Sequence, residues 1–440
     1  MTARLGFLGV GWIGRHRMQV IQASGAAEVA LIADASPDAA AQAAALAPGA
    51  RVVPSLQAML DAGVDGVVLA TPSALHAEQA VAALEQGAAV FCQKPLARTA
   101  AETRAVVDAA RAADRLLAVD LSYRFTAGAR AIRELIARGE LGEVYAVDLV
   151  FHNAYGPDKA WFRDPALAGG GCVIDLGVHL VDLALWTLGF PRVAGATSRL
   201  FAQGAPLGGR RDVVEDYALA RLDLEGGAVA QLACSWHLPA GCDAVIGAAF
   251  YGTGGGAALR NVNGSFYDFV AERYLGTRRE TLTEGADEWG GRAAVEWARR
   301  LAAGERYDPE VERLVEVARA LDLVYGRAEG AGEAGAEEAD GAAHAGSGRD
   351  GGRDGGRDGG RDGEREVGVR RGVEGATGVH GVHGVRGRAG APPRLHDADH
   401  PHRRRHLFAA GVIKAGQEAV ARERGAVVEA SALPFRRSTS

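Results

Sequence analysis

Short apolar runs alternate with alanine-rich stretches from Leu5 to Asp120. The runs are continuously apolar, which is typical of strands buried on both faces of a parallel sheet. The stretches between them favour helices, and two open with good helix-capping residues, Ser36 before Pro37 and Ser55. This alternation predicts a parallel sheet covered by helices on both faces. The predicted strands comprise residues 5–10, 29–33, 51–53, 66–70, 88–92 and 116–120.

The pattern changes after Tyr123. A predicted helix at residues 129–138 leads into longer runs that are rich in β-branched and aromatic residues, which predicts a larger, largely antiparallel sheet. Two later stretches, residues 293–303 and 311–325, predict helices packed on that sheet. The long runs comprise residues 144–151, 216–224, 228–236 and 244–251.

The composition changes once more near Glu329, where glycine, arginine, aspartate and histidine begin to dominate. Too few apolar residues are left there to offset the entropy of ordering the chain, so we expect residues 329–405 to be disordered. Residues 406–440 are expected to form a tail with one amphipathic helix near residues 407–420. A chain of 440 residues exceeds the usual size of one hydrophobic core, and two folded domains are predicted at residues 1–122 and 123–328.

Charge and composition exclude several classes of protein. The net charge of −6 gives no reason to expect a nucleic acid or an acidic membrane as partner. We find no apolar run near the roughly 20 residues that span a bilayer, and no signal peptide at the N-terminus, so we expect a cytoplasmic protein. The four cysteines contain no C-x-x-C pair and are expected to be reduced and mostly buried. The tail histidines are irregularly spaced, and we predict no metal site.

A glycine motif points to a dinucleotide. Gly9, Gly11 and Gly14 fit G-x-G-x-x-G, with Trp12 and Ile13 inside it, between a predicted strand and a predicted helix. In that context the first glycine permits a tight turn, the second lets the backbone approach a pyrophosphate, and the third lets helix and strand pack closely. The free N–H groups at the helix start would then face the diphosphate.

Asp34 follows Gly14 by twenty positions, at the end of the second predicted strand. A carboxylate there accepts hydrogen bonds from the adenosine ribose and repels a 2′-phosphate. The residues from Ala35 to Asp38 include no arginine that could bind such a phosphate. We therefore predict NAD rather than NADP as cofactor; the alternative is an aspartate that only ends its strand.

Two further segments end strands at the edge where parallel sheets bind ligands. Thr71 and Pro72 follow the fourth strand, with His76 four positions later as either a cofactor contact or an ordinary helix-start histidine. Gln93 and Lys94 end the fifth strand, next to a proline whose peptide bond could be cis. A lysine in this place can polarise or orient a substrate hydroxyl.

A second cluster begins with three glycines, residues 169–171, and continues into an apolar stretch that predicts a helix over residues 173–188. Asp175 and His179 are four positions apart and share a face of that helix, and Asp182 lies one turn beyond. Polar groups on a buried helix need partners. The cluster is therefore either a structural Asp–His pair or an acid–base site that is reached through a flexible glycine turn.

Taken together, these motifs resemble the glucose–fructose oxidoreductase/inositol dehydrogenase (Gfo/Idh/MocA) family, over residues 4–327 and in the family's order. The resemblance implies an α/β Rossmann domain followed by an α+β domain with a large, mostly antiparallel open sheet. It also implies that this sheet serves in homodimers or homotetramers. Lys94, Asp175 and His179 would surround the substrate carbon above the nicotinamide.

We expect reversible oxidation of a secondary alcohol on a sugar, inositol or related polyol. His179 would accept the hydroxyl proton, since an imidazole titrates near working pH. Lys94 would orient the oxygen and stabilise alkoxide charge, and Asp175 would hold a neighbouring hydroxyl or the imidazole. The candidate substrate-lining residues, whose alternative is ordinary packing between domains, are Tyr123, Arg124, Asn153, Trp161 and Arg163.

One position departs from the family pattern, which usually has glutamate before the catalytic lysine where this chain has Gln93. The amide removes a negative charge beside Lys94, so the family's pH optimum does not carry over. Two other classes share this fold: glycosidases that use NAD transiently without net redox, and regulators that bind dinucleotide without turnover. Such regulators need not keep Lys94, Asp175 and His179 together.

Overall fold

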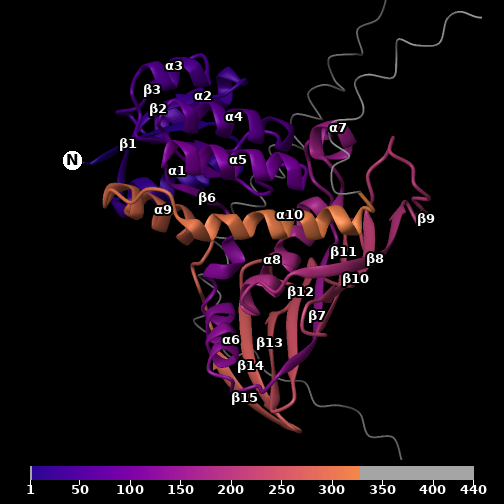
Figure 1. The fold of residues 1–440 in the computed structure, drawn as a ribbon. Coiled ribbons are helices and arrows are strands. Elements are labelled where there is room, and N and C mark those ends of the chain that lie inside the picture. The colour runs from indigo at the N-terminus through magenta and orange to yellow at the C-terminus, as the bar shows by residue number, and fades with distance from the viewer. Residues whose placement is uncertain (1, 328–440) are drawn as a thin grey trace, which may run out of the picture. The chain divides into compact units, whose positions relative to one another are not determined.

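The computed structural model describes residues 2–327, which form two sheets and the helices that cover them (Figure 1). The predictions for residues 329–405 and 406–440 lie outside the described residues. The expected order, a parallel sheet first and a larger sheet after it, is confirmed.

The first sheet has six parallel strands in the order β3-β2-β1-β4-β5-β6. Its strands are β1 (Ala3–Leu8), β2 (Ala27–Ala33), β3 (Arg51–Val52), β4 (Gly66–Leu69), β5 (Ala89–Cys92) and β6 (Leu117–Val119). The strand order reverses between β1 and β4, which is where open sheets of this type bind ligands at the carboxyl ends of their strands. The connecting helices are α1 (Trp12–Ser24), α2 (Pro37–Leu46), α3 (Leu56–Asp61), α4 (Ser73–Glu85) and α5 (Ala100–Ala113).

Helices bury both faces of this sheet, as the continuous apolar strands predict. On one face Phe7 and Phe91 pack with Met18 of α1, and on the other Leu69 packs with Leu84 of α4 and Val107 of α5. The predicted helix starts are also present, because the side chains of Ser36 and Ser55 accept backbone N–H groups of the first turns of α2 and α3.

The second sheet has nine strands in the order β15-β14-β13-β12-β7-β11-β10-β8-β9. Only the β7–β11 pair is parallel, so the sheet is mostly antiparallel, as expected. Its strands are β7 (Val144–Asn153), β8 (Val193–Ala202), β9 (Ala205–Pro206), β10 (Tyr217–Leu224), β11 (Val229–Ser235), β12 (Ala244–Gly252), β13 (Gly255–Asn261), β14 (Phe269–Leu275) and β15 (Arg278–Thr283).

Residues alternate along the strands of this sheet between a helix-covered face and an open face. Strand β10 shows the pattern, with Ala218, Ala220 and Leu222 buried and the intervening Leu219 46% exposed. The buried face packs against α6 (Ala127–Ala137) and α8 (Val178–Thr187). The short elements near these helices are η1 (Ser122–Phe125), η2 (Ala160–Arg163), α7 (Pro165–Ala168) and η3 (Val173–Gly177).

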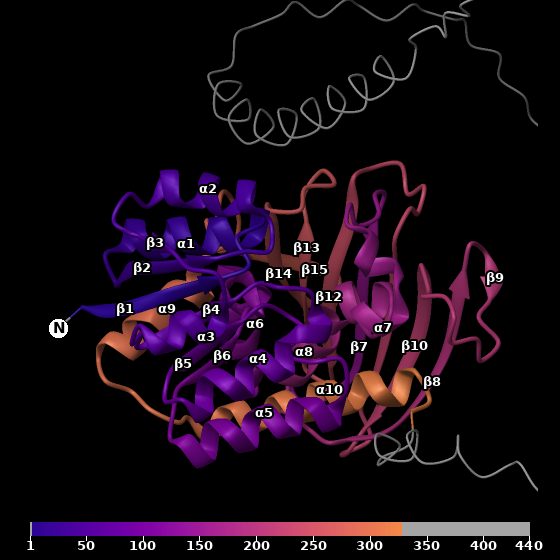
Figure 2. The same cartoon turned by 90° about the horizontal axis from the view of Figure 1, so that it is seen from above.

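The last two helices do not both pack on the second sheet, and the prediction that they do is wrong for α9 (Arg292–Ala302). That helix buries Ala294 and Trp297 against α1 and the first sheet, where Trp297 lies 5.6 Å from Phe91 between ring centroids. After η4 (Pro309–Glu312), α10 (Arg313–Val324) lies beside α5 and continues to α8 and β8, as Figure 2 shows. An amphipathic sequence specifies a buried face of a helix but not which sheet that face covers.

One helical stretch, Pro165–Thr187, is long and apolar enough to cross a membrane by composition alone, contrary to the sequence expectation that no such run exists. Within it, the 18-residue window that is apolar enough is 78% buried inside the protein, as the central helix of a folded core is.

Candidate functional site

The glycine loop has the geometry that its motif requires. Gly9 has φ +83°, and a Cβ there would lie 2.6 Å from the carbonyl of Ala70. A Cβ on Gly14 would lie 2.1 Å from the carbonyl oxygen of Gly9, so helix and strand pack too closely for any side chain. Gly11 has open space around it, and α1 begins directly after it without a side-chain cap or an acidic first turn. The first N–H groups of α1 are therefore free to bind an anion.

Asp34 ends β2 beside this loop. Its Oδ2 accepts the N–H of Val10 at 2.7 Å and its Oδ1 accepts the N–H of Ser36 at 2.8 Å. Each carboxylate oxygen has a second lone pair, so Asp34 can also accept from a ribose hydroxyl. The aspartate thus holds the glycine loop in addition to the role that the sequence predicts.

His76 lies beneath the sheet edge rather than on it. Its ring is buried, with Nδ1 at 2.7 Å from the carbonyl oxygen of Pro95 and Nε2 at 2.8 Å from that of Thr71. A neutral imidazole has only one N–H, so it donates to one of these oxygens at a time. Burial lowers the pKa of His76, and the Lys94 ammonium adds to that effect. Through these two carbonyls His76 joins the segments that follow β4 and β5. The cofactor contact stays one of its two predicted roles.

Gln93 contacts a carboxylate from the neighbouring strand. Its Nε2 donates to Oδ2 of Asp120 at 2.7 Å, and the same oxygen accepts from Nε of Arg17 at 2.5 Å. All three side chains are buried. The family's glutamate is replaced by a neutral amide at position 93, but the carboxylate of Asp120 lies in direct contact with that amide.

Lys94 and Asp175 form an ion pair across the two domains. Lys94 follows β5, where the Lys94–Pro95 peptide bond is cis. Its Nζ lies 2.6 Å from Oδ1 of Asp175 and donates to the backbone carbonyl of Asp175 at 2.7 Å. Both side chains keep some exposure, 20% for the lysine and 16% for the aspartate, so the pair can meet a substrate. Trp236, which the motif search missed, donates its indole N–H to Oδ2 of Asp175 at 3.0 Å.

The helix that carries Asp175 and His179 opens with a wider turn than predicted. Residues 173–177 form a π-helical turn, η3, before the regular helix α8 begins at Val178. Such turns are rare in proteins, and those that do occur are frequently found at functional sites. Asp175 lies on this turn and His179 on the first turn of α8, and Asp175 contacts Lys94, so the structure brings the three side chains to one end of the helix.

His179 lies among aromatic rings. Its ring is 4.9 Å from that of Tyr123 and 6.5 Å from that of Phe151, and within residues 2–327 neither of its ring nitrogens has a hydrogen-bond partner. Burial lowers its pKa well below the usual value of 6.5, and the positive charges of Lys94 and Arg17 lower it further. The imidazole is therefore neutral at neutral pH and is able to accept a proton.

The three glycines before this helix are closely packed, not a flexible turn. Gly169 has φ +82° and ends α7. A Cβ on Gly170 would lie 2.1 Å from the hydroxyl of Tyr325, and one on Gly171 would lie 1.9 Å from the backbone oxygen of Glu215. The buried Glu215 also accepts the N–H groups of Gly171 and Val173 through Oε1, at 3.0 and 2.9 Å. It thereby caps the start of the helix that carries Asp175 and His179.

Two of the five predicted lining residues are committed to protein contacts. Tyr123 packs on His179 and on Trp289, with ring centroids 4.9 Å apart in each pair. Arg124 binds Asp182 through two hydrogen bonds, one from Nε to Oδ2 at 2.8 Å and one from Nη2 to Oδ1. Asp182 is therefore the partner of Arg124.

The other three lie on the segment between β7 and α7. Asn153 caps the end of β7 by accepting the N–H of Tyr155, and Trp161 stacks on Phe162 with ring centroids 3.8 Å apart. Phe162 in turn lies edge-on to Trp236, at 6.5 Å, so this aromatic row leads to Asp175. Arg163 contacts the ring of His237 at 3.4 Å.

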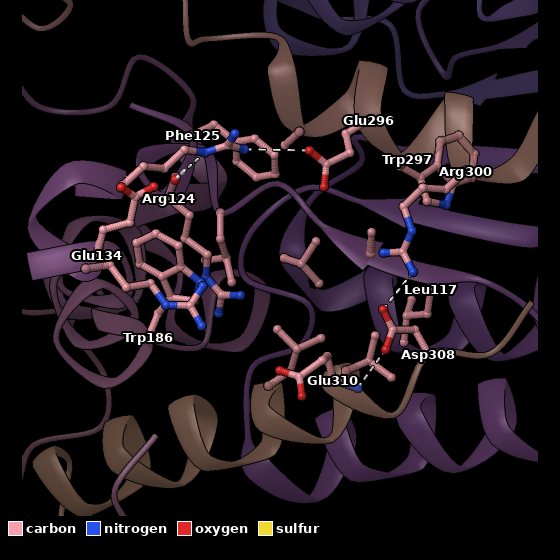
Figure 3. A pocket seen from close by; sticks show the side chains of 18 of the residues that line it. Leu117, Arg124, Phe125, Glu134, Trp186, Glu296, Trp297, Arg300, Asp308 and Glu310 are labelled. Atoms are coloured by element: carbon pink, nitrogen blue, oxygen red, sulfur yellow. Dashed lines mark hydrogen bonds and ion pairs between the residues drawn. The ribbon is translucent and has the colours of Figure 1, made fainter. Parts of the chain in front are cut away.

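A cavity of about 620 Å³ lies beside β6, between α6, α9 and the start of α10 (Figure 3). Four arginines and four acidic residues line it together with Trp186 and Trp297. Of the predicted site residues it includes only Arg124. The cavity is therefore separate from the Lys94–Asp175–His179 group.

Sequence reasoning missed three side chains of this site: Asp120, Glu215 and Trp236. Asp120 directly follows β6, and this position after an apolar strand was the one local signal. Glu215 and Trp236 flank β10 and β11, far along the chain from the residues that they contact. Nothing in their local sequence indicates those partners.

Comparisons with known proteins agree with this arrangement. Residues 3–121 match the model of an oxidoreductase family with an NAD-binding Rossmann fold, and residues 129–258 match the GFO/IDH/MocA C-terminal domain. The chain is 30% identical to D-glucoside 3-dehydrogenase of Escherichia coli, over 50% of this chain but only 63% of that protein. It is 32% identical to the putative UDP-kanosamine synthase oxidoreductase subunit of Amycolatopsis mediterranei, over 69% of this chain and 87% of the relative.

A solved structure extends the comparison to three dimensions. The structure of GenD2 from gentamicin A biosynthesis, in complex with NAD, superposes with a TM-score of 0.62 and 25% identity. It covers 74% of this chain and 94% of its own. The similarity therefore spans both sheets and not the first sheet alone.

Proposed function

Because the chain belongs to the GFO/IDH/MocA oxidoreductase family, whose N-terminal domain is an NAD-binding Rossmann fold, we propose that it interconverts a secondary alcohol and a carbonyl on a sugar, inositol or related polyol, with NAD(H) as cofactor. The single observation that carries the proposal is the Lys94–Asp175 pair, closed across the two domains with Nζ 2.6 Å from Oδ1 and with His179 four positions later, at the start of α8. The names of the two relatives support this substrate class: one is a D-glucoside 3-dehydrogenase, and the other is a putative UDP-kanosamine synthase oxidoreductase subunit.

The residues present suit NAD. The open space at Gly11 and the uncapped start of α1 would hold the diphosphate, and Asp34 would hold the adenosine ribose. The negative charge of Asp34 disfavours the 2′-phosphate of NADP. When bound, the nicotinamide supplies the hydride chemistry.

The protein would supply proton transfer and orientation. His179 accepts the proton of the substrate hydroxyl at Nε2, because Nδ1 is fully enclosed. Lys94 donates a hydrogen bond to the reacting oxygen and stabilises the negative charge that develops there. Asp175, held by Trp236 and Lys94, accepts from a neighbouring hydroxyl of the substrate. In the reverse direction the protonated His179 returns the proton to the carbonyl oxygen.

We further propose that the open face of the second sheet joins copies of the chain into a homodimer or homotetramer. That face carries Leu219 on β10 and Tyr251 on β12, which are 46% and 36% exposed. Light scattering on the purified protein and on Leu219→Arg tests this, because a charge in a buried interface would shift the mass toward the monomer. We also propose a cytoplasmic location, because all four cysteines are unpaired, which suits a reducing compartment.

The decisive experiment is a screen of sugars, inositols, sugar phosphates and nucleotide sugars for net NADH formation. Net NADH supports a dehydrogenase, whereas product without net NADH would indicate a glycosidase that uses NAD transiently. His179→Asn and Lys94→Ala should each reduce kcat by roughly 10²- to 10⁴-fold while NAD still binds. If both variants kept a normal kcat, or if no compound were turned over although NAD bound, the regulator function would replace this one.

A second experiment tests the cofactor. NAD should bind more tightly than NADP, and Asp34→Ala should narrow the difference because it removes the repulsion of the 2′-phosphate. Fluorescence titration with both dinucleotides measures this. Equal affinity in the unmutated protein contradicts the assignment of NAD.

A further inference from the structure

The residues that end α10 lie between the two loops that carry Lys94 and Asp175. Nη1 of Arg327 donates to the backbone carbonyl of Arg98 at 3.0 Å, four positions after Lys94. Nη2 of the same guanidinium donates to the backbone carbonyl of Gly169, six positions before Asp175. One side chain therefore bonds to both catalytic loops.

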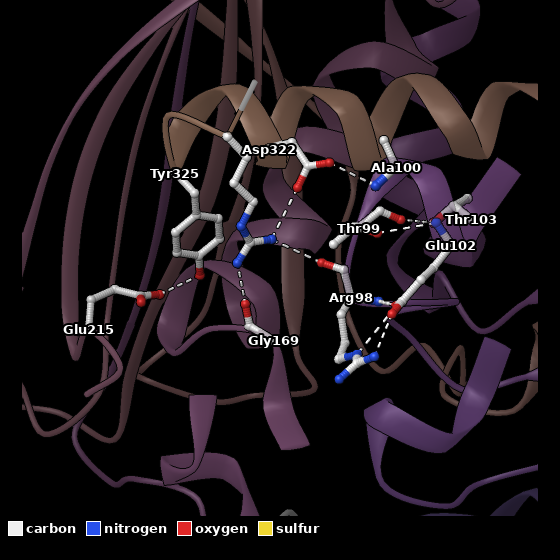
Figure 4. Close-up of polar contacts among 10 residues, drawn as sticks. Arg98, Thr99, Ala100, Glu102, Thr103, Gly169, Glu215, Asp322 and Tyr325 are labelled. Atoms are coloured by element: carbon white, nitrogen blue, oxygen red, sulfur yellow. Dashed lines mark hydrogen bonds and ion pairs between the residues drawn. The ribbon is translucent and has the colours of Figure 1, made fainter. Parts of the chain in front are cut away.

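Asp322, one turn earlier on α10, fixes the Rossmann side of this contact. Its Oδ2 accepts the N–H of Ala100 at 2.8 Å, at the N-terminus of α5, where a carboxylate also interacts favourably with the helix dipole (Figure 4). Its Oδ1 accepts from Nη1 of Arg327 at 3.0 Å, which holds the arginine in place. Arg98 adds a second link, because its Nη1 donates to the carbonyl of Ala166 in α7 at 2.7 Å.

Tyr325 fixes the side of the catalytic helix. Its hydroxyl donates to Oε1 of Glu215 at 2.7 Å, and that oxygen also accepts the first N–H groups of the helix that carries Asp175 (Figure 4). The Arg327 guanidinium lies over the Tyr325 ring, 4.3 Å from its centroid. The three side chains thus form one connected unit, which we call the clamp: Asp322, Tyr325 and Arg327.

The contacts of the clamp bear on the catalytic distance. Lys94 and Asp175 belong to different domains, so their 2.6 Å separation depends on how the loops around them are held. A displacement of about 1 Å at a reacting group can cost roughly 100-fold in rate. The Arg327 and Asp322 side chains are 29% and 16% exposed, so solvent screens their ion pair and its loss should affect global stability less than catalytic geometry.

We propose that Arg327, supported by Asp322 and Tyr325, is a positioning residue that holds Lys94 against Asp175 for catalysis. The expected effect of Arg327 on kcat rests on the proposed function. Its expected effect on the contact between Lys94 and Asp175 does not. Arg327 touches neither substrate nor cofactor and acts through the carbonyls of Arg98 and Gly169.

The kinetic test compares three variants. Arg327→Ala should lower kcat roughly 10- to 100-fold, with KM and the affinity for NAD little changed. Arg327→Lys keeps the charge but lacks the planar fork, so its kcat should lie between those of the alanine variant and the unmutated protein. Arg104→Ala is the matched control, because Arg104 also links α5 to the chain before α10, through an exposed ion pair with Glu312, yet contacts neither catalytic loop. An equal kcat for Arg327→Ala and Arg104→Ala would overturn the proposal.

A second readout needs no substrate. The lysines of the sequence are Lys94, Lys159 and Lys414, so acetylation by a reactive ester can be followed for each by mass spectrometry. Lys94 is held by Asp175, whereas Lys159 is 67% exposed and serves as internal reference. The ratio of Lys94 to Lys159 acetylation should rise severalfold in Arg327→Ala, rise less in Arg327→Lys, and stay unchanged in Arg104→Ala.

The two readouts separate failure of the clamp from failure of the proposed function. An unchanged labelling ratio in both Arg327 variants, or the same rise in Arg104→Ala, would overturn the clamp whatever the reaction is. A raised ratio in a protein that turns over no sugar would keep the clamp and remove the proposed function. If Arg327→Ala failed to fold, the ratio in Arg327→Lys would decide.

Discussion

At the scale of single residues, the site places a buried imidazole near positively charged side chains. His179 has an aromatic surrounding, and Lys94 and Arg17 add positive charge nearby. Both influences disfavour the imidazolium form. The His179 imidazole therefore stays neutral, and able to accept a proton, down to a lower pH than a solvated histidine would.

The lowered pKa of His179 leads to a prediction about activity. In alcohol oxidation the neutral imidazole is the active form, so kcat should stay level as the pH falls through 6.5 and should decline only at lower pH. The kcat of His179→Asn should not show this decline at low pH. It should recover in part at high pH, where hydroxide replaces the base. Steady-state kinetics across pH 5 to about 9 measures both effects.

Stability provides the control for this pH series. The unfolded chain protonates its histidines near 6.5, whereas folded His179 and His76 resist protonation. Below 6.5 the unfolded state therefore binds more protons, and the free energy of unfolding falls with falling pH. The folded fraction should be followed by circular dichroism at each pH. A decline in kcat at 6.5 in fully folded protein would contradict the assigned role of His179.

The three candidate catalytic residues could be found from the sequence because each lies in a short motif. Lys94 ends a strand before a proline, and Asp175 and His179 follow three glycines at helical spacing. Their partners could not be found in the same way. Asp120, Glu215 and Trp236 act through contacts with residues 27 to 110 positions away, and only the fold brings them together.

At the scale of elements, the turn before the catalytic helix shows how backbone packing sets a side chain's place. Glu215 supplies both a side-chain cap and a backbone oxygen to this turn. Gly171 leaves no room for a Cβ because that oxygen is 1.9 Å from where the Cβ would be. The glycines are therefore required for close approach and not for flexibility.

Gly171→Ala should lower the free energy of unfolding by at least about 1–3 kcal/mol, because the backbone of Glu215 must move. It should also lower kcat, because the same movement shifts Asp175. Gly195→Ala is the control, since a Cβ at that position in β8 meets nothing within 4 Å, and its effect should stay within about 0.5 kcal/mol. Urea unfolding measures both, and equal midpoints for the two variants would refute the packing argument.

The strands and helices of the first sheet were predictable because each is defined by neighbouring residues. The apolar runs near residues 5–10, 66–70 and 88–92 correspond to β1, β4 and β5. The second sheet was predicted in part, since β8, β9, β13, β14 and β15 carry weaker apolar runs and went unassigned. The sequence could not predict on which sheet α9 packs, because its small buried face of Ala294, Trp297 and Ala298 suits either sheet.

At the scale of the whole molecule, α10 and the clamp join the two sheets through contacts that end at Arg327. A chain that ends at Gly330 keeps all of the described contacts. We expect it to fold and to bind NAD with the affinity of the full chain. Thermal unfolding and NAD titration of the two chains test this, and a lost soluble fold or a weakened affinity in the short chain would place an essential element beyond residue 330.

The return of α9 to the first sheet also bears on how the protein is made. Strand β6 ends at Val119 and α9 begins at Arg292, so a ribosome at about 5–20 residues per second delivers the helix roughly 10 to 30 s after the sheet. Throughout that interval the apolar strip around Phe7 and Phe91 lacks the part of its cover that Trp297 and its neighbours on α9 supply, and a chaperone has a surface to bind. We expect nascent chains stalled near residue 200 to be cleaved readily by protease in the first 120 residues, and chains stalled beyond α9 to resist. Equal resistance to protease at both chain lengths would show that the first sheet and its helices fold stably without α9.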